Sequence, residues 1–246
     1  MDAATPTAEA GNLREQTLRR LRSDIITGRI QPGTLLSVPT LASEIGVSTT
    51  PVREALLTLE RDGLVAPLRN RGFRVEPLSI AQLENLFSLR ELVEVHAIVT
   101  IARKGLQDSR ELVALADAVG EAVGRGDVTG YLTTDRAFHT ALVARADNPL
   151  LTQLVLQLRD GMRLYGIDSP EGRQRQQDSV AEHYRLVELA QQGQADEAAA
   201  LMSHHILSWK PLFSAALEGR APAGALWRSL VPPPDRGLQM RGHAPD

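Results

Sequence analysis

Residues 48–65 read STTPVREALLTLERDGLV, and this stretch decides the fold of the front of the chain. Its apolar residues recur at helical spacing, and Pro51 falls in the first turn, where a helix tolerates proline. A helix-turn-helix needs a small residue between its helices, a turn residue that accepts positive φ, and an apolar residue that locks the pair. Ala42, Gly46 and Val52 supply these at suitable spacing. The stretch therefore predicts the second helix of a helix-turn-helix.

The segments on either side complete a winged helix-turn-helix domain over residues 12–76. The run NLREQTLRRLRSDII has one apolar face and predicts an amphipathic first helix, which ends before Gly28. A short second helix, PTLASEI, ends at Gly46. After the opening stretch, the runs LVAP and GFRVEP predict two strands that are joined by a tight turn, LRNRG. Residues 1–11 show no periodicity and predict a disordered tail.

The leading end of this second helix and the tip of the hairpin are the candidate DNA contacts. Ser48 or Thr50 can cap the helix, so that its first N–H groups and the positive end of its dipole face outward, ready for a phosphate. Arg53 is the first choice for reading a base, because a guanidinium matches O6 and N7 of guanine in the major groove. The alternative is that Arg53 pairs with Glu54, with Glu60 or with a neighbouring helix and never meets DNA. The candidate set is Ser48, Thr49, Thr50, Arg53, Asn70, Arg71 and Gly72.

From residue 80 onward the sequence predicts an all-helical domain, joined to the first domain by a linker at 77–79. We expect six helices up to residue 218, connected by short loops, which is typical of an antiparallel bundle. Their expected caps are Ser79, Asp108, Asp127, Asn148 and Ser169, with a last helix from near Ala195. The predicted fold class is mainly α. Residues 219–246 are rich in Gly and Pro and predict a disordered tail.

The formal charge of −3 hides an asymmetry between the two halves. Residues 12–76 carry ten Lys and Arg against seven Asp and Glu, whereas residues 77–218 carry thirteen against nineteen. A basic front and an acidic back favour contact of the front alone with a polyanion. The chain has no cysteine, which excludes disulfides, thiolate zinc fingers and cysteine nucleophiles. We found no signal peptide and no membrane-spanning apolar run, so we expect a cytoplasmic protein without a membrane partner.

Histidines in the helical half form a candidate metal site. Asp135 and His139 lie one helical turn apart and so share a face, while His183 comes from another helix and His204 and His205 from the last. One carboxylate and three imidazoles suit zinc, nickel or manganese and leave a position open for water or a ligand. The alternative is that these are ordinary buried histidines with hydrogen-bond partners.

Both halves resemble known families. VSTTPVREALLTLERDGLV followed by NRGFRV resembles the DNA-binding domain of GntR-family transcription regulators, although this chain has Thr49 where the family often has arginine and SVPT at 37–40 where the family has a Glu-containing stretch. The motifs Asp-x-x-x-His at 135–139, Glu-His at 182–183 and Met-x-x-His-Ile at 202–206 resemble the FCD effector domain of the FadR subfamily, in its six-helix, VanR-like version.

The resemblance to FCD domains implies a sensor that binds a small organic acid beside a metal ion. It implies that the metal ligands are Asp135, His139, His183 and His205, with His205 preferred over His204 because of the Met-x-x-His-Ile register. A carboxylate can complete the coordination sphere and pair with an arginine. The candidate arginines are Arg90, which the resemblance favours, Arg159 and Arg163. The alternative for these arginines is a surface salt bridge with Glu91, Glu94 or Asp160.

The leading hypothesis is therefore a ligand-responsive transcription regulator. One recognition helix reads few base pairs, so we expect a homodimer on an inverted-repeat operator, with half-sites about one DNA turn apart. Repression relieved by an acid is the usual expectation, although the sequence leaves open whether the ligand weakens or strengthens binding to the operator. The rival hypothesis is a metalloenzyme with a three-histidine, one-carboxylate centre. Glu182 is badly placed as its general base, because it points about a quarter turn away from His183, and we therefore expect no enzyme activity.

Overall fold

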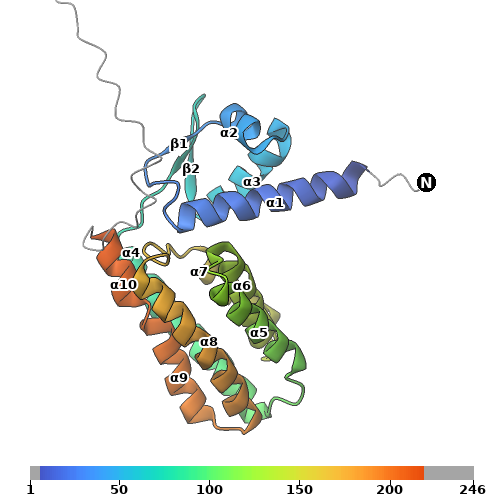
Figure 1. Ribbon diagram of the computed structural model, residues 1–246, viewed down its shortest axis with the longest axis vertical. Coiled ribbons are helices and arrows are strands. Elements are labelled where there is room, and N and C mark those ends of the chain that lie inside the picture. Colours follow the sequence, from blue (N-terminus) through green and yellow to red (C-terminus); the bar gives the residue numbers. More distant parts are fainter. Residues whose placement is uncertain (1–5, 219–246) are drawn as a thin grey trace, which may run out of the picture.

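Two units follow one another along the chain, a small N-terminal domain and a bundle of helices (Figure 1). The computed structural model describes residues 6–218, with side chains from residue 13 onward. None of the helices in that range is both long and apolar enough to cross a membrane. The tail expected at 219–246 lies outside the described residues.

The N-terminal domain packs three helices against a three-stranded antiparallel sheet. Its elements are α1 (Pro6–Ile26), β1 (Leu35–Leu36), α2 (Val38–Ile45), α3 (Thr49–Arg61), β2 (Val65–Leu68) and β3 (Gly72–Val75). The strand order is β1-β3-β2, with Leu36 opposite Phe73 and Val65 opposite Val75. These four side chains are buried in one core with the apolar faces of the helices. The predicted winged helix-turn-helix is confirmed.

The turn between α2 and α3 depends on Gly46. Its backbone has φ +79°, and its N–H donates to the carbonyl of Ala42 at 3.0 Å. A side chain would disfavour this left-handed conformation. Val52 lies fully buried in the next helix, and Leu56 and Leu59 continue the buried stripe. Burial of this stripe determines which face of α3 points outward.

Two elements of this domain differ from the sequence-based expectation. Helix α1 begins at Pro6, so the residues at 6–11, which we expected to be disordered, belong to the helix. Alanine and glutamate in this segment favour a helix, and proline is tolerated at the first position. Strand β1 was not predicted, because a strand of two residues has no periodicity in the sequence. It forms only because β3 offers it a pairing edge.

The C-terminal domain has seven helices in the described part of the chain. They are α4 (Ile80–Lys104), α5 (Arg110–Gly124), α6 (Val128–Ala144), α7 (Pro149–Asp160), α8 (Pro170–Gln191), α9 (Ala195–Leu207) and α10 (Lys210–Leu217). The side chains that cap their helices as predicted are those of Ser79, Asp127, Asn148 and Ser169. Helix α5 begins one residue later than expected, because Ser109 rather than Asp108 occupies its cap position.

The count of six helices was wrong, because α10 is separate from α9. Pro211 has no N–H to donate to the carbonyl of Leu207, and its ring would clash with that carbonyl in a continuous helix. Helix α9 therefore ends at Leu207, and a new helix, α10, begins at Lys210. Trp209 and Phe213 lie on either side of this break and stack with ring centroids 5.4 Å apart.

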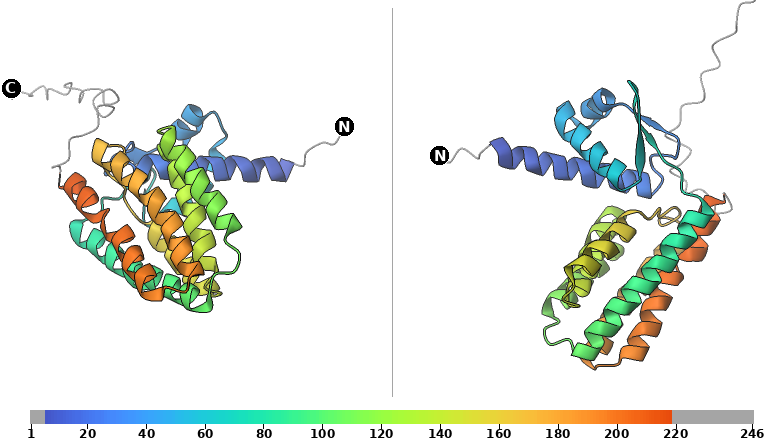
Figure 2. Two further views of the ribbon diagram at one scale, coloured as in Figure 1. Left: turned by 60° about the horizontal axis from the view of Figure 1, so that its bottom comes forward. Right: turned by 180° about the vertical axis from the view of Figure 1, so that it is seen from behind.

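Helix α1 lies across one end of the bundle (Figures 1 and 2). The backbone N–H of Leu164, in the segment between α7 and α8, donates to the carbonyl of Ile26 at 2.7 Å. Arg22 of α1 bonds both Asp62, at the end of α3, and the backbone carbonyl of Asp160, at the end of α7. The two domains therefore touch through α1, which belongs to one and covers an end of the other.

We predict that Gly72→Ala destabilises the N-terminal domain strongly. Gly72 has φ +108°, and a Cβ there would overlap the carbonyl oxygen of Leu36 in β1. Backbone strain and overlap together should cost about 2–4 kcal/mol. Gly46→Ala is the matched control, because φ is also positive there but nothing lies within 4 Å of the added carbon. It should cost only about 1 kcal/mol. Chemical denaturation of both variants measures the difference, and equal losses would contradict the overlap with β1.

Candidate functional site

The leading end of α3 is an exposed surface of the N-terminal domain. Its outward side chains are those of Ser48, Thr49, Thr50 and Arg53. Ser48 occupies the cap position with an extended backbone, but its side chain makes no capping hydrogen bond. Within residues 13–218 Arg53 forms no ion pair, whereas the neighbouring Glu54 pairs with Arg14 at 3.7 Å. The pairing of Arg53 with Glu54 or Glu60, considered above, is not observed, and its guanidinium is available.

The wing between β2 and β3 has a backbone suited to a tight tip. Asn70 has φ +59°, a left-handed conformation that asparagine tolerates, and both Asn70 and Arg71 are exposed. Gly72 was expected to let the wing approach DNA closely. It also has a structural role, because the absent side chain leaves room for the carbonyl of Leu36 in β1, and its contact with DNA stays a prediction.

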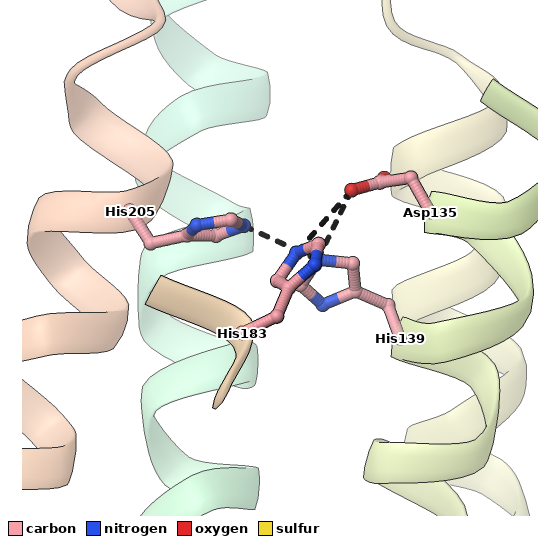
Figure 3. Close-up of side chains that lie close together, drawn as sticks. All are labelled: Asp135, His139, His183 and His205. Carbon is pink, nitrogen blue, oxygen red and sulfur yellow. Dashed lines mark hydrogen bonds and ion pairs between the residues drawn. The ribbon is translucent and has the colours of Figure 1, made fainter. Parts of the chain in front are cut away.

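In the bundle, four predicted metal ligands come together. Asp135 and His139 of α6, His183 of α8 and His205 of α9 each offer one ligand atom, and these atoms lie within 4.8 Å of one another. Figure 3 shows the four side chains converging from three helices. Nε2 of His139 lies 3.2 Å from Nε2 of His205, and Oδ1 of Asp135 lies 3.4 Å from Nε2 of His183. His204 is exposed and lies outside this group, with its Nε2 3.5 Å from Oε1 of Glu182.

Unsatisfied nitrogens indicate that the group is built to hold a cation. Both ring nitrogens of His183, and Nδ1 of His139, are buried without a hydrogen-bond partner among the described residues. Leaving such atoms unpaired in a protein interior is costly, and a metal ion would satisfy Nε2 of His183. The ring of Phe138 stacks on that of His183 at 4.1 Å and holds it in place. The donor set therefore fits a divalent transition ion.

The protonation states also suit metal binding. Burial lowers the pKa of His139 well below its ordinary value, and nearby Arg159 adds to this effect. Burial likewise lowers the pKa of His205 to about 4. Burial alone would raise the pKa of Asp135, but the neighbouring His183 and Arg159 outweigh it and lower that pKa. At neutral pH His139 and His205 are thus neutral imidazoles and Asp135 is an ionised carboxylate, the forms that coordinate metals.

Glu182 orients one of these histidines from outside the group. Its Oε2 lies 2.6 Å from Nδ1 of His205, and Arg175 bonds the same carboxylate. A carboxylate on the outer nitrogen fixes the ring so that Nε2 faces the centre. From its place beside His183 in the sequence, Glu182 was considered above as a badly placed general base. Its real neighbour, His205, is 23 residues away in another helix, which no local spacing indicates.

Glu94 is a fully buried carboxylate that holds two of the three candidate arginines. Arg90 donates from Nε to Oε1 at 2.8 Å, while Arg159 donates from Nε and Nη2 to Oε2 at 3.0 and 2.7 Å. Nη1 of Arg159 reaches Oδ2 of Asp135 at 3.2 Å. The salt bridges considered for Arg90 and Arg159 with Glu94 do form, but in the interior rather than on the surface. They connect α4 and α7 to the metal-ligand group.

The three arginines differ in what they can still bind. All three guanidinium nitrogens of Arg159 donate to carboxylates. In Arg90 only Nε does so, and its two terminal nitrogens make no hydrogen bond with the described residues. Arg163 lies elsewhere, because Nη2 donates to the carbonyl of Gly63 in the N-terminal domain at 3.2 Å. Arg163 is thus an interdomain contact, and Arg90 is the arginine best placed to receive a carboxylate.

A cavity of about 410 Å³ connects these features. Arg90, Arg159, Asp135 and His205 line it, and so do residues of α1. A volume of this size is in the range of small-molecule sites. An anion in the cavity would meet the free end of Arg90 and the open side of the metal-ligand group.

Comparison with protein families matches both halves of the chain. A profile described as "FCD domain" matches residues 85–208, about half of the chain, and one described as "Bacterial regulatory proteins, gntR family" matches residues 13–75. These ranges lie within the helical domain and the winged helix-turn-helix.

Relatives with curated names agree. The uncharacterized HTH-type transcriptional regulator BphR of Paraburkholderia xenovorans (strain LB400) is 30% identical over 217 residues, which cover 82% of this chain and 86% of BphR. The HTH-type transcriptional regulator McbR of Escherichia coli (strain K12) is 31% identical over 140 residues, which cover 56% of this chain and 63% of McbR. The HTH-type transcriptional repressor GlaR of the same organism is 28% identical and is covered to 96% of its length.

Solved structures share the fold. The structure described as E. coli McbR/YncC superposes with a TM-score of 0.67 at 23% identity, covering 85% of this chain and 98% of that one. The metalloenzyme alternative has no support from any of these similarities. The chain is a member of the GntR family of bacterial transcription regulators, of the type that carries an FCD domain, and it binds DNA rather than catalysing a reaction.

Proposed function

We propose that the protein is a homodimeric repressor that a small carboxylic acid, bound beside a divalent metal ion, releases from an inverted-repeat operator. The observation that carries the proposal is the position of Arg90. Its two terminal nitrogens are unengaged within the described residues, and it lines the same cavity as the Asp135 and His205 side chains.

Asp135, His139, His183 and His205 would hold the metal. Zinc is our first choice, with nickel and manganese as alternatives, because all three accept imidazole and carboxylate ligands. The ion would supply a Lewis-acidic position that an effector oxygen can complete. Arg159 keeps Asp135 ionised and in place, and Glu182 keeps the ring of His205 turned inward.

Arg90 would bind the effector carboxylate. Its Nε is fixed by Glu94, so that the planar end of the guanidinium is held in one orientation. Two parallel N–H donors match the two oxygens of a carboxylate. Arg159 is then a positioning residue, since its donors already bind Glu94 and Asp135.

Exposed leucines support a homodimer. Leu92 of α4 is 68% exposed and Leu150 of α7 is 78% exposed, and Leu89 and Leu154 on the same two helices are also exposed. Helices α4 and α7 pack against each other through a buried cluster that includes Ala97. Large exposed apolar side chains on adjoining helices are typical of a protein interface. A second copy on this surface would present two recognition helices to an inverted repeat.

We predict that Arg53→Ala weakens binding to the operator more than binding to random duplex. Loss of a base contact should reduce specific affinity about 10- to 100-fold, while non-specific affinity stays close to that of the parent. Arg61→Ala, at the other end of α3, is the matched control and should change both affinities little. Fluorescence anisotropy with an inverted repeat from the protein's own promoter measures both. Equal loss on the two duplexes would remove Arg53 from base reading.

We predict that the purified protein contains about one transition-metal ion per chain and that His183→Ala abolishes it. Within the described residues the one close polar neighbour of the His183 ring is Asp135, another member of the group, at 3.4 Å, so the substitution acts on the proposed ligand set itself. His204→Ala is the control, because this neighbour of His205 is exposed. Elemental analysis by mass spectrometry gives the stoichiometry. A metal content that survives His183→Ala would exclude the proposed group.

We predict that short mono- and dicarboxylates raise the melting temperature of the metal-loaded protein and that Arg90→Ala removes this effect. A ligand that binds only the folded state stabilises it. Glu94 keeps Arg159 as a partner in this variant, so the fold should survive. Arg103→Ala, exposed on the same helix, is the control. Stabilisation that persists in Arg90→Ala, or that is unaffected by a chelator, would contradict the proposed site.

A further inference from the structure

The cavity extends from the metal-ligand group to helix α1 of the DNA-binding domain. Thr129, near the start of α6, lies at the α1 end, because its Oγ1 is 3.4 Å from Oγ of Ser23. Asp135 follows six residues later on the same helix, which corresponds to about 9 Å along the helix axis. Both residues and Ser23 line the cavity. An effector that fills it must therefore be longer than a carboxylate group alone.

Aromatic side chains form the wall between the two ends. Tyr131 lies one turn before Asp135 on α6, and Trp209 lies one turn after His205, with their ring centroids 6.4 Å apart. Phe213 continues the stack. The hydroxyl of Tyr131 is already paired with Ser179, so the wall offers mainly apolar surface. We call Tyr131, Trp209 and Phe213 the aromatic wall.

The charges at the α1 end are neutralised within the protein. Arg136 binds Asp160 through two hydrogen bonds of 2.8 and 2.9 Å, and Arg22 bonds Asp62 and the backbone of Asp160. Arg19, which also lines the cavity, pairs with Glu15 at 3.5 Å, so each of these arginines already has an acidic partner. Leu18 and Ile26 of α1 line the cavity beside them and offer apolar contacts. This end favours an apolar group over an anionic one.

We propose that the effector is a monocarboxylic acid of about six carbons or more, whose apolar body lies along the aromatic wall and reaches α1. The 410 Å³ cavity has about fourteen times the volume of a water molecule in the liquid, far more than acetate needs. The first helix of the DNA-binding domain is then part of the effector site. This inference rests on the proposed function, because it takes Arg90 as the place of the carboxylate.

The test is a calorimetric titration of the zinc-loaded full chain with acetate, hexanoate and adipate. Hexanoate should bind at least tenfold more tightly than acetate, because its chain leaves water for the aromatic wall. Adipate has the same six carbons but a second charge, and it should bind at least tenfold more weakly than hexanoate. Equal affinities for acetate and hexanoate, or for hexanoate and adipate, would overturn the inference.

Variants of Leu18 test the contact with α1. Leu18→Trp should fill that end of the cavity and reduce the affinity for hexanoate to nearly that for acetate, while acetate binds as before. Leu18→Ala, which disturbs folding less, should reduce the affinity for hexanoate severalfold and leave the affinity for acetate unchanged. Leu13→Trp is the matched control, since Leu13 is exposed on the same helix and does not line the cavity. Unchanged hexanoate affinity in both Leu18 variants would exclude α1 from the site.

The outcomes separate the two proposals. If acetate binds the parent but not Arg90→Ala, and hexanoate binds no more tightly than acetate, only the proposal of an apolar body is overturned. No binding of any of the three acids to the zinc-loaded parent would overturn both the carboxylate site and the inference built on it.

Discussion

The helical domain depends on one buried carboxylate. Glu94 is 0% exposed, and an isolated charge in such a place would be strongly destabilising. Arg90 of α4 and Arg159 of α7 neutralise this charge through ion pairs, and Arg159 extends the network to Asp135. Truncating Glu94 would therefore leave two buried cations without this partner, one of which, Arg159, also holds Asp135. The network joins the packing of α4 on α7, the proposed carboxylate site at Arg90 and the proposed metal-ligand group in a single electrostatic arrangement.

The sequence predicted the features that depend on local spacing. Gly46 between Ala42 and Val52 identified the helix-turn-helix, and a family resemblance together with the one-turn spacing of Asp135 and His139 identified the metal-ligand group. The sequence did not predict the neighbours of that group. Glu94 and Arg159 are 65 residues apart, and their pairing depends on how α4 packs on α7. Spacing along one helix contains no information about such contacts.

Errors at the ends of elements have the same physical origin. Strand β1 is too short to show a period, and it exists only through its pairing with β3. Pro211 was visible in the sequence, but its effect was missed because the apolar pattern continues through it from Ile206 to Phe213. The partner of a single side chain is equally hard to predict from the sequence. Arg163 was expected beside the effector, but it faces the other domain and binds the carbonyl of Gly63.

Helix α3 is preceded by a serine whose side chain does not cap it. Ser48 makes no capping hydrogen bond, so the first turn of this helix can accept a partner from outside the described residues. On a duplex, a backbone phosphate can take that place. In the free protein, the same amide groups are the place where a small oxyanion of the buffer could bind. Sulfate or phosphate in the medium would then act as weak competitors of the operator, beyond their general screening of charge.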